Sequence, residues 1–240
     1  HIEAGGVQVI DTVTDAVVAR VQTAGFPMHC TFRPEGRYVF VASHGANAVQ
    51  IIDGIAREVI ATIPVGRAPH NLAVSPDGRS LWVSNIGSSD LSVIDRVTLK
   101  VKATIQVGKA PLGLAMSPDG TRVYSGNTGT GDLSVVDAAA LGVLATVPVG
   151  RGVNQVKVST DGKTLWVALG SEAAVAVLDT VSHRVVARIP VGQGPHGIAF
   201  TADGKHVYVT NSDSNDVSVI DIATQKVIET IAVGKAPACL

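Results

Sequence analysis

An excess of charge of either sign is missing from this chain of 240 residues, in which 19 Lys and Arg stand against 20 Asp and Glu. The net charge of −1 provides no overall attraction to nucleic acid or to an anionic membrane surface, so it disfavours both partners. No apolar run reaches the roughly 18 residues that a membrane span requires. The first residues lack a basic start followed by an apolar stretch, so we expect any signal peptide to lie outside this chain.

Cysteine and aromatic residues are also scarce. Two cysteines are too few for a disulfide framework, a four-cysteine zinc site or a paired CxxC motif, so they do not fix the redox compartment. The chain is nevertheless 46% hydrophobic and only 16% charged, which excludes a disordered tail and allows a large core.

Glycine, in contrast, is abundant, and its spacing reveals an internal repeat of 42 residues. Three separate series follow this period without an insertion: Gly66, Gly108, Gly150, Gly192 and Gly234; Gly36, Gly78, Gly120, Gly162 and Gly204; and Asp11, Asp53, Asp95, Asp137, Asp179 and Asp221.

Each repeat contains short apolar runs separated by turn residues, which is the spacing of β-strands. In the repeat that begins near Ala68, we expect strands at 70–75, 80–84, 91–94 and 101–107. The turn after the first of them, Pro76-Asp77-Gly78, has proline and glycine at the positions that a tight turn requires. The last run alternates apolar and polar residues, as expected for an outer strand with one wet side.

Four strands in 42 residues, repeated, predict an all-β fold: a β-propeller of four-stranded blades. The runs "APHNLAVSPDG" and "GPHGIAFTADG" resemble the YVTN family of β-propeller repeats. The four residues that give this family its name are present as Tyr208-Val209-Thr210-Asn211. The resemblance covers nearly the whole chain. It implies a propeller, and export to the periplasm or the cell surface, but no particular function, because propellers include both binding modules and enzymes.

The repeat phase predicts one propeller domain, 1–240. We expect residues 1–24 to supply strands three and four of the closing blade, residues 235–240 to begin that blade, and complete blades at 25–66, 67–108, 109–150, 151–192 and 193–234. Six periods exceed the chain by about a dozen residues. Two interpretations remain: six blades closed by both termini with one strand missing, or a fragment of a longer, seven-bladed protein.

Several repeated residues are best explained by what every blade needs. The Asp series that ends each "VID" fits an Asx turn between strands three and four. The aromatic series in strand two fits packing between blades, and Asn85, Asn127 and Asn211 fit a turn-capping role. The aromatic series is Phe40, Trp82, Tyr124, Trp166 and Tyr208.

Candidate ligand-binding residues lie at the start of each first strand, which in a propeller lines the central channel. One repeat position there holds Met28, His70, Leu112, Asn154, His196 and Ala238, and His29 stands one position along. Imidazoles that converge on an axis can bind a transition metal, a cofactor or an anion. We therefore select His29, His70, Asn154 and His196 as channel-mouth residues, with His29, His70 and His196 as the candidate metal ligands; nothing in the sequence requires a cofactor.

Basic residues follow the same phase. Arg67, Lys109 and Arg151 share one loop position, and Lys235 continues the series, so we expect a partial ring of positive charge that attracts a small anion or an acidic protein surface. Asp90, Asp132 and Asp216 in neighbouring loops are expected to balance it in part.

Two function classes follow. The first is an exported, non-catalytic β-propeller that presents its loop face to a protein or a small anionic ligand. The alternative is a redox or lyase-type enzyme with a metal or cofactor at the channel-mouth histidines, as the similar repeat style of amine dehydrogenase heavy chains and of the haem d1 propeller of nitrite reductases implies. No CxxCH haem-attachment motif occurs.

Cys30 and Cys239 provide a test of whether six blades close into a ring. Five periods separate their positions to within one residue, which makes them neighbours on adjacent first strands if six blades close. A disulfide requires Cα atoms within about 7 Å. The sequence leaves open whether they pair.

Overall fold

The computed structural model describes residues 5–32 and 36–238, and within them the chain is all β apart from one turn of 3₁₀ helix, η1 (His44–Ala46). The chain divides into two compact units, His1–Gln106 and Val107–Leu240. No helix among the described residues is long and apolar enough to cross a membrane.

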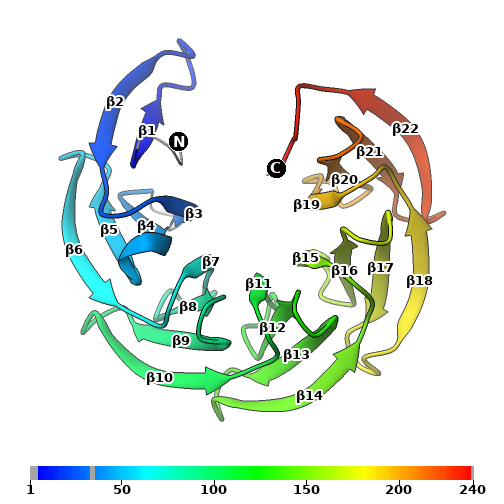
Figure 1. Cartoon of the computed structure of the whole chain (residues 1–240), viewed down its shortest axis with the longest axis horizontal. Helices are drawn as coiled ribbons and strands as arrows, with labels where there is room; N and C mark the ends of the chain where they lie inside the picture. The colour runs from blue at the N-terminus through cyan, green and yellow to red at the C-terminus, as the bar shows by residue number, and fades with distance from the viewer. Residues whose placement is uncertain (1–4, 33–35, 239–240) are drawn as a thin grey trace. The chain divides into compact units, whose positions relative to one another are not determined.

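The first unit contains one two-stranded and two four-stranded antiparallel sheets, each in simple chain order (Figure 1). Its strands are β1 (Gly6–Ile10) and β2 (Val17–Gln22); β3 (Pro27–Phe32), β4 (Tyr38–Ser43), β5 (Ala48–Asp53) and β6 (Glu58–Pro64); and β7 (Pro69–Val74), β8 (Ser80–Asn85), β9 (Asp90–Asp95) and β10 (Lys100–Gln106).

The second unit contains three four-stranded antiparallel sheets in the same simple order. Its strands are β11 (Pro111–Met116), β12 (Arg122–Asn127), β13 (Asp132–Asp137) and β14 (Gly142–Pro148); β15 (Val153–Val158), β16 (Thr164–Leu169), β17 (Ala174–Asp179) and β18 (Val185–Pro190); and β19 (Pro195–Phe200), β20 (His206–Asn211), β21 (Asp216–Asp221) and β22 (Lys226–Ala232).

These sheets confirm the predicted all-β class and the four-stranded blade. The strands of the second complete repeat, β7 to β10, lie within a residue or two of the expected ranges. Within each unit the first strands of successive sheets contact one another, β3 with β7, β11 with β15 and β15 with β19. The division of the chain into the blades predicted above, as one domain, stays a prediction.

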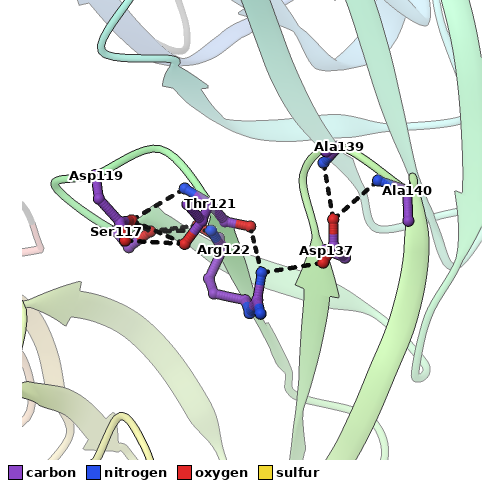
Figure 2. Close-up of polar contacts among 7 residues, drawn as sticks. All are labelled: Ser117, Asp119, Thr121, Arg122, Asp137, Ala139 and Ala140. Atoms are coloured by element: carbon purple, nitrogen blue, oxygen red, sulfur yellow. Dashed lines mark hydrogen bonds and ion pairs between the residues drawn. The ribbon is translucent and has the colours of Figure 1, made fainter.

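The turns between strands three and four are built by aspartate, as predicted. Asp137 Oδ1 accepts the backbone N–H groups of Ala139 and Ala140 at 2.9 and 2.8 Å (Figure 2). These bonds favour the carboxylate and lower the pKa of Asp137. The same two-donor turn forms at Asp11, Asp53, Asp95 and Asp179.

A second aspartate turn joins strands one and two. Asp119 Oδ1 accepts the Ser117 hydroxyl at 2.5 Å and the Thr121 backbone N–H at 3.0 Å (Figure 2). The Ser117 hydrogen bond is the largest cause of the lowered pKa of Asp119. Arg122 then reaches Asp137 at 3.0 Å, which ties the two turns of this sheet together. Asp77, Asp161 and Asp203 form the equivalent turn in other repeats.

The strand-two aromatics pack between sheets, as predicted, wherever both sheets lie in one unit. Phe40 is 2% exposed and belongs to a core cluster with Leu72 and Leu81 of the next sheet. Trp166 is 1% exposed and lies in a cluster with Ile198 and other residues of β19 to β21. The core of each unit therefore lies between its sheets.

The strand-two asparagines differ from the predicted turn caps. Asn85 is fully buried, and its Nδ2 donates to Asp90 Oδ1 at 2.6 Å and to Ser92 Oγ at 2.9 Å. Ser92 Oγ also accepts the backbone N–H of Gly66 at 3.3 Å, from the segment that joins two repeats. The asparagine therefore organises a buried side-chain cluster, and this cluster binds the segment that joins the preceding repeat to this one. Asn127 and Asn211 form the same Asn–Asp–Ser cluster.

Candidate functional site

Every first strand has a β-bulge just after its opening proline or valine. The register shifts between Pro27 and His29 in β3, and between Pro69 and Leu72 in β7. A bulge breaks the regular alternation of side chains and redirects them. The predicted channel-mouth residues His29, His70, Asn154 and His196 all lie in or next to such bulges, in β3, β7, β15 and β19.

In the second unit, two of the predicted residues bind the backbone of the following repeat. Asn154 Nδ2 donates to the Pro195 carbonyl oxygen at 2.9 Å. His196 Nδ1 lies 2.6 Å from the Ala238 carbonyl oxygen. The first contact joins β15 to β19, and the second joins β19 to the chain that follows β22, a structural role that the sequence did not predict.

In the first unit, His29 and His70 are half-buried on the neighbouring strands β3 and β7. The predicted metal set of His29, His70 and His196 includes both units, so it stays a prediction. Among the described residues, no group of three His, Cys, Asp or Glu side chains is placed to hold a metal ion.

A cavity of about 260 Å³ lies between β1 and β3 in the first unit. Register places Cys30 opposite Val41 and His29 opposite Ala42, so Cys30 and His29 project from opposite faces of the sheet. Cys30 is exposed. Cys239 lies outside the described residues, and the Cys30–Cys239 pairing stays a prediction. The cavity is lined by Gly6, Val7, Gln8, Pro27, Met28, His29, Cys30 and Val41.

An aromatic pair that the sequence did not predict lies at the loop end of the first complete repeat. The rings of Phe26 and His44 stack with centroids 5.1 Å apart, and Phe26 remains 41% exposed. His44 belongs to η1, and a Cβ on Gly45 would lie 3.2 Å from the Phe26 ring, so the ring packs closely on this glycine. The signal was present, because other repeats have Ala68 and Ala110 at the position of Phe26.

The predicted basic residues are exposed. Arg67, Lys109 and Arg151 lie in the segments between a fourth strand and the next first strand, and none forms an ion pair within residues 5–32 and 36–238. Three arginines elsewhere are paired with carboxylates: Arg37 binds Asp53 at 2.8 Å, Arg122 binds Asp137 at 3.0 Å and Arg188 binds Glu172 at 3.0 Å. The loop series therefore leaves its positive charge available to a ligand.

The aspartates expected to balance this charge accept hydrogen bonds from the strand-two asparagines. Asp90 is only 5% exposed and accepts a hydrogen bond from Asn85. Asp132 and Asp216 accept the Nδ2 of Asn127 and Asn211 at 2.7 and 2.6 Å. A hydrogen bond from a neutral amide leaves the carboxylate charge in place, so the expected partial balance stays a prediction.

Lys157 is a further residue whose environment the sequence did not predict. It is half-buried in β15, directly opposite the buried Trp166 in β16. Burial lowers the pKa of Lys157, since it disfavours the charged ammonium group. Other repeats have Ala73, Ala115 and Ala199 at this position, so the fold does not require a lysine there.

Two family models match parts of the chain. One described as "Cytochrome D1 heme domain" matches residues 1–107, and one described as "YNCE-like beta-propeller" matches residues 115–203. Each covers less than half of the chain. No curated protein matches it significantly.

Solved structures match nearly the whole chain. Hydrazine synthase of Kuenenia stuttgartiensis is 20% identical with a TM-score of 0.89, and the match covers 98% of this chain and 82% of that one. A Bacteroides fragilis protein described as a candidate 6-phosphogluconolactonase is 20% identical with a TM-score of 0.81, over 98% of this chain and 78% of that one. At this identity the likeness shows the fold alone, and with the sheets described above it confirms the predicted β-propeller of four-stranded blades.

Proposed function

We propose that this β-propeller, of YVTN-like repeat type, is an exported binding scaffold that uses its loop face to hold a small anionic ligand or an acidic protein surface. The observation that carries this proposal is the series Arg67, Lys109 and Arg151. These side chains share one loop position, are exposed and form no ion pair within the part of the chain that the structure describes.

The anion preference has a simple electrostatic basis. A cation that is paired with a carboxylate produces little net electrostatic potential around it. An unpaired cation attracts anions over about one screening length, roughly 8 Å at physiological salt. Lys109 and Arg151 occupy equivalent positions in consecutive repeats of the second unit. Each therefore presents a similar charge at the same end of its sheet.

Binding of inorganic phosphate and of a polyglutamate peptide, measured by calorimetry, tests the proposal. The double variant Lys109→Ala, Arg151→Ala is expected to lose most of the binding, and added salt is expected to weaken binding by the parent. The control is Lys163→Ala, Lys205→Ala, which removes the same charge from turns where each lysine lies near its own aspartate, Asp161 or Asp203. Equal losses in both variants would contradict a site at the loop series.

Export follows from the YVTN resemblance and is part of the proposal. Fractionation of the source cells, followed by immunodetection of the chain, is expected to place it in the periplasm or on the cell surface. Recovery with the cytoplasm would refute this part without affecting the binding measurements.

The enzyme alternative is supported by one specific observation. The match described as a cytochrome D1 haem domain covers residues 1–107, the part that contains His29 and His70. Imidazole is a common ligand of haem iron and of transition metals. Elemental analysis and an absorption spectrum of the purified protein separate the two functions, because stoichiometric metal or haem would favour the enzyme. His70→Leu, which uses the residue found at Leu112, would then be expected to release that group.

A further inference from the structure

The segment around β14 is the one fourth-strand segment without charge. Residues 138–150, which contain β14 and the turns at both its ends, hold no Asp, Glu, Lys or Arg. The corresponding segments of the other repeats each contain at least two charged residues. They are 12–24, 54–66, 96–108, 180–192 and 222–234.

β14 is also a free sheet edge with apolar side chains on it. Among the residues that the structure describes, it is the last strand of its sheet and pairs only with β13. Val143 is 41% exposed and Leu144 is 52% exposed. A bulge leaves Leu144 without a partner in β13, so this side chain projects from the strand.

The other fourth strands all carry charge, although the position of Leu144 is itself apolar in three of them: Ile60, Val186 and Ile228, which are 49%, 56% and 58% exposed. Lys102 occupies the position of Leu144 in β10, where the same bulge occurs, and charged side chains on edge strands discourage pairing with other chains. β6 carries Glu58, β18 carries Arg188 and β22 carries Glu229. β14 keeps the bulge but has lost the charge.

We propose that the β14 edge, defined as residues 138–148, is a contact surface for a second copy of this chain. A twofold contact brings each residue near its own symmetry mate, so any charged side chain close to the axis would meet a like charge. The β14 edge alone among the fourth-strand segments avoids this cost. Its exposed Val143 and Leu144 then cover the same residues of the partner copy.

The size of the edge sets the strength of the contact. Seven strand residues extend about 23 Å. Stable complexes usually bury about 1,200 Å² or more, so we expect a contact limited to one strand edge to be weak. The dimer is therefore transient and depends on protein concentration.

Sedimentation velocity across a wide range of protein concentration tests the proposal. The parent is expected to shift toward a dimer as concentration rises, and Leu144→Lys is expected to raise the dissociation constant roughly tenfold or more, since two ammonium groups would meet near the axis. Lys102 shows that this repeat position accepts a lysine, and a thermal melt of the variant checks that it folds.

Val186→Lys is the matched control. Val186 occupies the same position in β18 and is 56% exposed, yet the segment around it already contains Arg184 and Arg188. It is expected to leave the dimer unchanged. A parent that stays monomeric at every concentration overturns the proposal, and so does an equal effect of both lysine variants. High salt should preserve this apolar contact while it weakens anion binding, so failure of one proposal is distinguishable from failure of the other.

Discussion

Replacement of Trp166 by alanine should measure how strongly the sheets of the second unit hold together. The side chain is 1% exposed, its ring meets the Phe200 ring edge-on at 5.9 Å, and its Nε1 donates to Thr164 Oγ1 at 3.0 Å. Removal of a buried tryptophan typically costs about 3–5 kcal/mol, because the lost transfer free energy adds to the cost of the cavity. About 0.5–1.5 kcal/mol of that loss would come from the aromatic pair.

That loss converts to a melting shift of about 6–20 °C, since a chain of this size loses roughly 2–4 °C for each kcal/mol. Thermal and urea unfolding followed by circular dichroism are the measurements. Trp166→Phe is the control, because Phe40 occupies the same repeat position, and less than half of the alanine loss is expected from it. An unfolding midpoint equal to that of the parent in Trp166→Ala would show that the strand-two aromatics do not hold the sheets together.

Three further predictions concern stability. Gly66→Ala should lower the free energy of unfolding in urea by about 1–3 kcal/mol, because the new Cβ would lie 2.6 Å from Asn85 Nδ2. Gly234→Ala is the control: it stands at the same repeat position, its new Cβ would have nothing within 4 Å, and it should be neutral. Equal effects of the two variants would refute the steric reason. Lys157 has a lowered pKa in the folded chain, so the free energy of unfolding should rise as pH increases from that folded pKa toward about 10.4, the pKa of an unperturbed lysine. Urea midpoints measured across this range test this, and Lys157→Ala should abolish the rise. Asp95 also has a lowered pKa, so its carboxylate stabilises the fold above about pH 3.9, and this stability is lost as pH falls through the folded pKa. Asp95→Asn should therefore have a lower urea midpoint than the parent at neutral pH, and the two midpoints should converge in acid. A difference that stays the same in acid would contradict this.

The fold could be predicted from the sequence because the repeat supplies the same information several times. A single Asp95 after a short apolar run is weak support for a turn, but the same residue at every period excludes coincidence, and its Asx turn forms as expected. The aromatic series worked for the same reason. Trp166 packs between sheets because every repeat requires a large side chain at that position.

The site was harder to predict because its residues are those that depart from the repeat. Asn154 and His196 are polar groups at a channel position, and sequence alone does not reveal that each meets a backbone carbonyl group of the next repeat. Glu172 shows the same limit. Its carboxylate accepts the backbone N–H of Arg151 at 2.7 Å and binds the Arg188 guanidinium at 3.0 Å, a long-range arrangement in a repeat that lacks the asparagine cluster.

The hydrogen bond from Gly66 to Ser92 crosses the boundary between two repeats, and this has a consequence for how such a gene can evolve. A duplicated segment of 42 residues carries its own serine acceptor for the glycine of the copy before it, and its own glycine for the serine of the copy after it. Unequal crossing-over can therefore add or delete whole copies, and the hydrogen bond between neighbouring repeats forms again without any further mutation. Two copies depart from this pattern. The copy at 25–66 has Gln50, whose Oε1 accepts the backbone N–H of Ala24 at 2.8 Å, and the copy at 151–192 has Ala176, which has no side-chain acceptor. The order of these two copies in the gene is therefore fixed more firmly than that of the others.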